Sequence, residues 1–226
     1  MRIGVVIPDR GDRPKFLDNC LRMLRAQTLK PYIFMVISDP PANHMCDITK
    51  RYRAGYSKMS EIGMDIDVIA FIENDDWYSP KYLETMASAW DNHGRPDLFG
   101  TNYTIYYHLG VKGYFTMTHP DRSSAMNTFI KPGLNIKWPV DHEPFTDMHL
   151  WMNLKGITFK PEEIIAIGMK HGVGMCGGRN HKDRLNRFRF EDHDFRFLKG
   201  HLDNESFKFY SQIHENITDI SQQRPA

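Results

Sequence analysis

The sequence predicts an α/β fold with a mainly parallel central sheet. Three short apolar runs lack a polar face, which is typical of strands buried on both sides of such a sheet. These runs are residues 3–7, 32–37 and 68–72. A candidate helix follows each run, at residues 15–28, 47–64 and 81–93. This alternation predicts a doubly wound sheet, and right-handed crossovers bring the carboxyl ends of its strands to one crevice.

The second half of the chain predicts antiparallel strands added to that core. Residues 97–108 alternate and are rich in strand-forming residues, and residues 113–118 can pair with them as a hairpin. A short polar element at residues 123–130 precedes a helix that starts near Thr146. A short strand at residues 164–167 and a glycine-rich loop at 172–178 follow.

The composition changes after the glycine-rich loop. Residues 179–201 interleave Arg, Lys and His with four phenylalanines, a mixture that can contact phosphates or stack on bases. Acidic residues dilute this charge, so we expect instead a helix that packs on the core by its Phe face. We divide the chain into a main domain at 1–178, with halves at about 1–95 and about 96–178, and a helical extension at 179–226.

Composition excludes several classes of protein. The formal net charge of +1 gives no global field for nucleic acid or membrane. The three cysteines, Cys20, Cys46 and Cys176, are far apart and form no CxxC pair, which argues against a zinc site or a disulfide framework. No signal-peptide pattern precedes the first strand, and no apolar run approaches the roughly 20 residues that span a bilayer. We therefore expect a cytoplasmic protein without a transmembrane segment.

The third apolar run ends abruptly in three carboxylates and an amide, Glu73, Asn74, Asp75 and Asp76. At the carboxyl end of a parallel strand these side chains face the crevice where open α/β sheets bind ligands. Carboxylate oxygens suit Mg²⁺ or Mn²⁺, which proteins hold with one or two carboxylates together with substrate phosphates. The plain alternative is that the two Asp residues only cap a surface turn. Ser79 and Pro80 then predict a helix start, with Ser79 as the N-cap.

The other two strand ends also carry polar residues. Arg10 and Arg13 lie in the loop after the first strand, where arginines are well placed to meet phosphate or a base. Asp39 follows the second strand and can accept hydrogen bonds from a ribose or a base. The predicted topology brings these residues and Lys58 towards the acidic turn. Their plain alternative is an ordinary set of loop and surface residues.

Asp147 lies in the first turn of the helix that starts near Thr146. An acidic residue there complements the helix dipole, which is a sufficient structural reason for its presence. It can also point into a cleft and act as a general base.

Four stretches taken in order resemble a family-2-type glycosyltransferase with a GT-A fold. The opening Val5-Val6-Ile7-Pro8, with Arg13-Pro14 and Leu24-Ala26-Gln27-Thr28, resembles the first strand, loop and helix of that family. Val36-Ile37-Ser38-Asp39 resembles the second strand, and residues 71–80 resemble the DxD-type segment. Thr146-Asp147-Met148-His149-Leu150-Trp151 resembles the helix start that carries the catalytic base. The order and spacing fit over roughly residues 1–175. The resemblance therefore implies that residues 1–178 are a GT-A catalytic domain, with a nucleotide half at about 1–95 and an acceptor half at about 96–178.

The resemblance implies a role for each matching residue. Pro8, Arg10 and Asp39 would line the nucleotide pocket, and Lys58 would approach nucleotide or phosphate. Asp76, helped by Asp75, would hold the divalent ion, Mn²⁺ or Mg²⁺, that bridges the diphosphate. Asp147 would deprotonate the acceptor hydroxyl. His171 lies where some GT-A enzymes supply a metal or phosphate contact. Two positions depart from the family pattern, since Asn74-Asp75-Asp76 is not a strict Asp-x-Asp and Thr146 replaces the usual Glu.

These implications predict an inverting, metal-dependent transfer of a sugar from a nucleotide-diphosphate sugar, with UDP as the first donor to test. The alternatives are a nucleotidyltransferase, against which the absence of a glycine-rich loop with a trailing Lys near the N-terminus argues, and a non-catalytic GT-A module that binds nucleotide or glycan. The sequence does not identify the acceptor, which could be a glycan, a lipid-linked glycan, a small molecule or a protein. Modified DNA is a further candidate because residues 179–201 are basic and aromatic.

Overall fold

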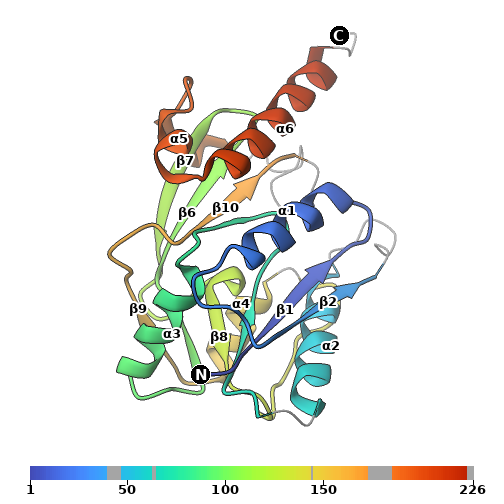
Figure 1. The fold of residues 1–226 in the computed structure, drawn as a ribbon, viewed down its shortest axis with the longest axis vertical. Coiled ribbons are helices and arrows are strands. Elements are labelled where there is room, and N and C mark those ends of the chain that lie inside the picture. The colour runs from blue at the N-terminus through green and yellow to red at the C-terminus, as the bar shows by residue number, and fades with distance from the viewer. Residues whose placement is uncertain (40–46, 63–64, 144, 173–184, 223–226) are drawn as a thin grey trace.

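The computed structural model describes residues 1–39, 47–62, 65–143, 145–172 and 185–222. Residues 173–178 of the glycine-rich loop, Cys46, Cys176 and residues 179–184 lie outside this range. Two sheets form the framework, with the helices packed around them (Figure 1). Within the described residues, no helix is long and apolar enough to cross a membrane.

Sheet A has six strands in the order β2-β1-β3-β8-β5-β9. β1, β2 and β3 are mutually parallel, β8 runs against its neighbours β3 and β5, and β5 and β9 are parallel, so five strands share one direction. The predicted mainly parallel sheet is therefore confirmed. The strands are β1 (Ile3–Asp9), β2 (Ile33–Ser38), β3 (Val68–Phe71), β5 (Leu98–Thr101), β8 (Thr128–Ile130) and β9 (Gly156–Phe159).

Alternate residues of β1 build two apolar layers on the two faces of sheet A. Val5 and Ile7 belong to a core cluster shared with α1 and α3, and Val6 belongs to a second cluster shared with α2 and α4. The sheet is thus covered on both faces, as a doubly wound fold requires. These helices are α1 (Pro14–Arg25), α2 (Ile48–Glu61), α3 (Tyr82–Asn92) and α4 (Thr146–Asn153).

Sheet B adds the expected antiparallel part. The predicted hairpin is confirmed as β6 (Tyr103–His108) and β7 (Gly113–Thr118), and β10 (Ala166–Lys170) pairs with β6 in parallel. Two very short strands complete the sheet order β11-β7-β6-β10-β4. They are β4 (Trp77–Tyr78) and β11 (Phe190–Glu191), and a 3₁₀ turn, η1 (Ala125–Asn127), precedes β8.

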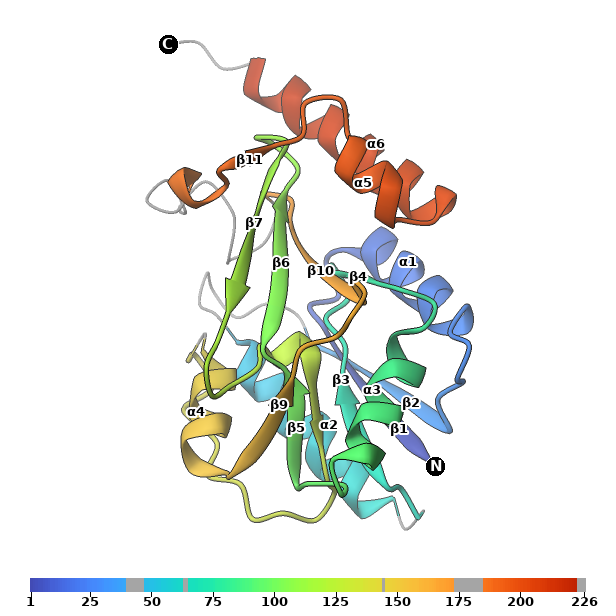
Figure 2. The ribbon, with the colours of Figure 1, turned by 90° about the vertical axis from the view of Figure 1, so that its left-hand side faces the viewer.

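The carboxyl-terminal segment packs onto this framework through α5 (Arg196–His201) and α6 (Asn204–Gln222). Leu198 and Tyr210 are fully buried in the core cluster that contains β1 and α1. Arg22 of α1 bonds to Asp203, just before α6. Figures 1 and 2 show both helices beside α1, at the end of the molecule away from the N-terminus.

Three expectations about the strands and the third helix are wrong. β2 is not buried on both sides, because it forms the edge of sheet A and leaves Phe34 43% exposed. Residues 97–108 do not form one strand, because the chain bends at Asn102 and passes from sheet A to sheet B. Ser79 is not the N-cap of α3, which begins at Tyr82; the Ser79 hydroxyl instead accepts a bond from the Lys81 amide in the preceding turn.

The expectation for residues 179–201 is met only in part. Their described portion holds a helix of six residues, α5, rather than a long one, and a two-residue strand precedes it. Two of the four phenylalanines, Phe195 and Phe197, pack on the core, and the Phe197 ring stacks on Tyr114 with centroids 3.9 Å apart, whereas Phe190 is 52% exposed.

Gln27 follows α1 and links it by hydrogen bonds to the start of α3, and its substitution tests this link. Its buried amide donates to the Ser79 carbonyl at 2.8 Å and accepts from the Leu83 amide at 2.9 Å. Gln27→Leu removes the side-chain partner of the Leu83 amide and one of the two donors to the Ser79 carbonyl, which keeps its bond from the Tyr82 amide. The change should cost roughly 1–3 kcal/mol, measured by urea denaturation. Gln212→Leu, at an exposed position of α6, is the matched control. Equal midpoints for both variants would contradict the role given to Gln27.

Candidate functional site

A cavity of about 470 Å³ opens where β1 and β3 end and the hairpin of sheet B begins. Several predicted site residues line it: Pro8, Arg10, Arg13, Asp75, Asp76 and Asp147. Asp39, Lys58 and His171 are not among its lining residues. The carboxyl ends of the parallel strands therefore do meet at one site, as the topology requires.

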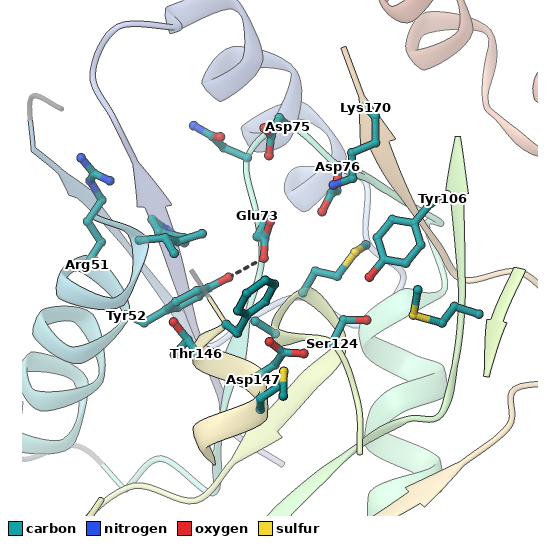
Figure 3. Close-up of a pocket in the computed structure, with 18 of the residues that line it drawn as sticks. Arg51, Tyr52, Glu73, Asp75, Asp76, Tyr106, Ser124, Thr146, Asp147 and Lys170 are labelled. Atoms are coloured by element: carbon teal, nitrogen blue, oxygen red, sulfur yellow. Dashed lines mark hydrogen bonds between the residues drawn. The ribbon is translucent and has the colours of Figure 1, made fainter. Parts of the chain in front are cut away.

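The turn after β3 gathers three carboxylates. One oxygen each of Glu73, Asp75 and Asp76 lies within 4.8 Å of the others. The chain can hold them so close because β3 and β4 are both buried and fix the two ends of the turn. Figure 3 shows these side chains turned towards the same cavity. Close carboxylates in a partly buried place are the arrangement that a hard divalent cation needs.

Asp76 is the most buried member of the cluster. Its Oδ1 accepts a hydrogen bond from the Met169 amide of β10 at 2.7 Å. Its Oδ2 is buried and has no hydrogen-bond partner among the described residues. Burial raises the pKa of Asp76 well above its usual range, although the nearby Lys170 opposes the shift. An orphaned carboxylate oxygen beside two further carboxylates fits a divalent cation as its missing partner.

Asp75 is held by two basic side chains. Its Oδ2 accepts a bond from Arg13 at 2.7 Å and lies 2.9 Å from the Nε2 atom of His171. Burial alone would raise the pKa of Asp75, but His171 and Arg13 hold it well below its usual range. His171 thus reaches the carboxylate cluster through Asp75. Its own ring is buried against Phe16, with centroids 4.4 Å apart.

Asn74 points away from the cluster and holds the end of β1. Its Nδ2 donates to Asp9 Oδ1 at 2.7 Å, and its Oδ1 accepts from Arg13 at 3.3 Å. Asp9 is buried, and its other oxygen accepts from the Gly11 amide at 3.0 Å. The amide of Asn74 is therefore required as a donor at this position, which explains why the segment departs from a strict Asp-x-Asp.

Glu73 is bonded from the side of α2. The buried Tyr52 hydroxyl donates to Glu73 Oε1 at 2.8 Å (Figure 3). The Glu73 amide donates to the Tyr78 hydroxyl at 2.8 Å. Burial raises the pKa of Glu73, and the charge of Asp75 adds to the shift. Glu73 stands beside the two predicted ligands, so it is a third candidate for holding a cation.

Lys170, the last residue of β10, places a cation beside these carboxylates. Its Nζ lies 5.1 Å from the centroid of the Tyr106 ring. Burial alone would lower the pKa of Lys170, but the charges of Asp76 and Glu73 raise it above its usual value. The site therefore contains an ammonium group as well as three acids. Sequence patterns did not single out Lys170, because β10 reaches the acidic turn only through the pairing of sheet B.

Asp147 approaches the cavity from the start of α4. Its Oδ2 pairs with Arg122, which lies in the chain between β7 and η1. Burial raises the pKa of Asp147 above its usual value, and Arg122 opposes that shift. The preceding Thr146 is buried and shares a short hydrogen bond with Thr49 of α2, so it anchors the helix start. Figure 3 shows Asp147 on the side of the cavity away from Lys170.

The predicted nucleotide residues fall into two groups. Pro8, Arg10 and Arg13 border the cavity. Asp39 instead pairs with Lys50 near the surface, and Lys58 is exposed in the last turn of α2. Arg51 lines the cavity, whereas Asp39 and Lys58 do not. Its side chain is 2% exposed, and its Nη1 lies 2.6 Å from Asp47 Oδ1.

One wall of the cavity is aromatic and comes from the hairpin and the carboxyl-terminal segment. The Tyr106 and Phe115 rings stack with centroids 5.3 Å apart, and Phe188 meets Phe115 edge-on at 5.0 Å. Arg187 lines the cavity next to Phe188. Part of the basic and aromatic tail therefore borders the site, although the pairing of Phe188 with β7 residues was not foreseeable from its own sequence.

Comparisons with known proteins identify the fold. No protein-family model and no curated protein matches the chain. Among solved structures, the 1–349 fragment of TarS from S. aureus in complex with UDP-GlcNAc aligns with a TM-score of 0.52 and 12% identity, over 75% of this chain and 59% of that one. The same fragment with UDP aligns with a TM-score of 0.50 and 13% identity, over 75% and 60%.

TarS is a GT-A glycosyltransferase, so the predicted GT-A fold is confirmed. The chain spans about 59% of the TarS fragment that it matches. At this level of identity the likeness establishes the fold and leaves the activity to be argued from the site.

The hydrogen bond from Asn74 to Asp9 predicts that completing the Asp-x-Asp motif destabilises the protein. Asn74→Asp would complete an Asp-x-Asp pattern, but it replaces the donor to Asp9 with a carboxylate. Two adjacent buried acids should lower the unfolding free energy by roughly 1–3 kcal/mol at pH 8, with a smaller loss at pH 5. Thermal unfolding at both pH values measures this, with the exposed Asn204→Asp as control. An unchanged or raised stability at pH 8 would contradict the proposed contact.

Proposed function

We propose that this chain is a glycosyltransferase of the hexosyltransferase class, which moves a sugar from a nucleoside-diphosphate sugar to an acceptor hydroxyl. One observation carries the proposal: a GT-A sheet brings the Glu73, Asp75 and Asp76 cluster and Asp147 to a single cavity. The structural neighbours were solved with UDP-GlcNAc and UDP, which supports a UDP-linked donor.

The nucleotide would lie between the loop after β1 and the start of α2. Pro8, Arg10 and Arg13 border this part of the cavity, and we add Arg51 to them. Asp39 would act indirectly, because its carbonyl oxygen accepts a bond from Arg51 at 2.7 Å. Lys58 has no part in the proposal. The diphosphate would then reach the acidic cluster at the end of β3.

Asp76, Asp75 and Glu73 would hold a divalent cation, Mn²⁺ or Mg²⁺. When bound, such a cation supplies charge that neutralises the diphosphate leaving group. Arg13 and His171 keep Asp75 ionised and oriented, and the Met169 amide fixes Asp76. His171 would be a residue that positions Asp75, in place of the direct ligand that the family resemblance implies.

Asp147 would take the proton of the acceptor hydroxyl as that oxygen attacks the anomeric carbon. Its raised pKa suits a general base, because a stronger base accepts a proton more readily. Attack from the side of Asp147, opposite the leaving diphosphate, inverts the anomeric centre in one displacement. The apolar wall of Tyr106, Phe115 and Phe188 would cover the acceptor and exclude water, which would otherwise hydrolyse the donor.

The donor site is tested by calorimetric titration of UDP, with and without Mn²⁺. We expect Mn²⁺ to strengthen UDP binding to the wild type and Asp76→Asn to lose that gain, because the variant removes the charge of a proposed ligand. Asp18→Asn, at an exposed position of α1, should behave as the wild type. Wild-type protein that binds no nucleotide would refute the proposed function, and UDP binding that ignores Mn²⁺ would refute the cation.

The base is tested by the pH dependence of transfer and by the product. Arg122 lowers the pKa of Asp147, so Arg122→Leu should move the acid limb of kcat/KM to higher pH. Arg95→Leu removes another arginine–aspartate pair, far from the cavity lining, and should leave the limb in place. The product should show an inverted anomeric configuration by NMR. A retained configuration, or an acid limb that Arg122→Leu does not move, would remove Asp147 from the role of base.

A further inference from the structure

Lys170 is held in the cavity by the pairing of sheet B. It ends β10, in register with His108 of β6, and its Nζ lies over the ring of Tyr106. This placement does not depend on a flexible loop, because β10 lies between β6 and β4 in the sheet. Figure 3 shows the amino group of Lys170 directed towards Asp76, within the cavity.

The ammonium group faces acids without touching them. Among the described residues, no carboxylate oxygen lies within 4.0 Å of Nζ, and Nζ makes no hydrogen bond. Asp76 and Glu73 nevertheless act on it as the strongest neighbouring charges. Lys170 lines the cavity, and its Nζ is not among the buried atoms that lack a partner, so water reaches it and a ligand in the cavity can replace that water.

The charge balance indicates the sign of that ligand. Arg13 offsets the charge of Asp75, and a divalent cation would offset the two remaining acids, Glu73 and Asp76. Lys170 is then a positive charge without a counter-ion. An oxygen that could lie against both the cation and the ammonium group is that of a phosphate.

We propose that Lys170 binds the diphosphate of the nucleotide donor and holds its negative charge as the sugar–phosphate bond breaks. This inference rests on the proposed function. It assigns the diphosphate two different cationic contacts, one dependent on added metal and one built into β10. Because the cation offsets Glu73 and Asp76, which otherwise face Lys170, the contribution of Lys170 to donor binding should be larger with the divalent cation than without it.

If Lys170 were only a counter-ion for Asp76, a different result would be expected. A counter-ion contributes to stability and would affect every ligand of the cavity alike. A diphosphate contact affects only ligands that carry the diphosphate. The comparison of UDP with uridine separates the two roles, because the ligands differ in the phosphates alone.

The test is calorimetric titration of UDP and uridine, each in EDTA and in Mn²⁺, against wild type, Lys170→Met and Lys160→Met. Lys160 is the matched control, because its Nζ also lies 5.1 Å from a tyrosine ring, that of Tyr103, but it does not line the cavity. Lys170→Met should weaken UDP binding by about 10- to 100-fold in Mn²⁺ and by a smaller factor in EDTA, and it should leave uridine unchanged under both conditions. Lys160→Met should change neither.

Lys170→Arg keeps the charge and should retain most of the affinity for UDP, which guards against a simple loss of folding. Equal UDP affinity in wild type and Lys170→Met, or equal losses of UDP and uridine, would overturn the inference. Wild type that binds neither ligand would refute the proposed donor. Titration of inorganic pyrophosphate then decides the inference: binding that depends on Lys170 supports it, and binding that does not depend on Lys170 overturns it.

Discussion

Four acidic side chains lie near one another at the end of a buried sheet, and keeping them there has a high free-energy cost. How that cost is offset governs the rest of the structure. Each acid is stabilised differently: Asp9 by amide donors, Asp75 by Arg13 and His171, Glu73 by the Tyr52 hydroxyl, and Asp76 by the Met169 amide. Buried carboxylates without such partners would take up protons or unfold the turn. Among these four acids, only Asp76 keeps a buried oxygen with no partner among the described residues, so it is the acid with an atom left for a further contact.

The core strands that are buried on both faces were predictable from the sequence, because a short apolar run without a polar face indicates such a strand. β1 and β3 have no polar face and lie at the centre of sheet A. The same type of apolar run misled the prediction for β2, since an edge strand can be apolar while all but one of its six residues are at least partly exposed. The change of sheet at Asn102 was hidden for another reason: alternation describes a strand but does not say which partners it has.

Within the site, local patterns found the residues that lie on one turn and missed those that depend on long-range pairing. Asp75 and Asp76 follow a strand directly, so their position was fixed by the strand. Lys170 and Arg122 come from sheet B and the chain beyond β7, and Arg51 faces inward on a helix of mixed composition. Lys58 was expected at the site because it precedes β3, but α2 starts at the cavity and carries its last turn away from it.

The carboxyl-terminal segment shows why the site and the core are physically one unit. The Tyr210 hydroxyl of α6 donates to the Asp75 carbonyl at 3.3 Å, and Asp203 accepts bonds from Arg22 of α1. Arg187 and Phe188 border the cavity from the same segment. The acidic turn is therefore supported on one side by α1 and sheet A and on another by α6. A turn that must keep three acids close tolerates little movement, because a small shift changes both their repulsion and their hydrogen bonds. The phenylalanines of α5 and α6 and the residue before α5 therefore have a structural role, because they pack the carboxyl-terminal segment against the core.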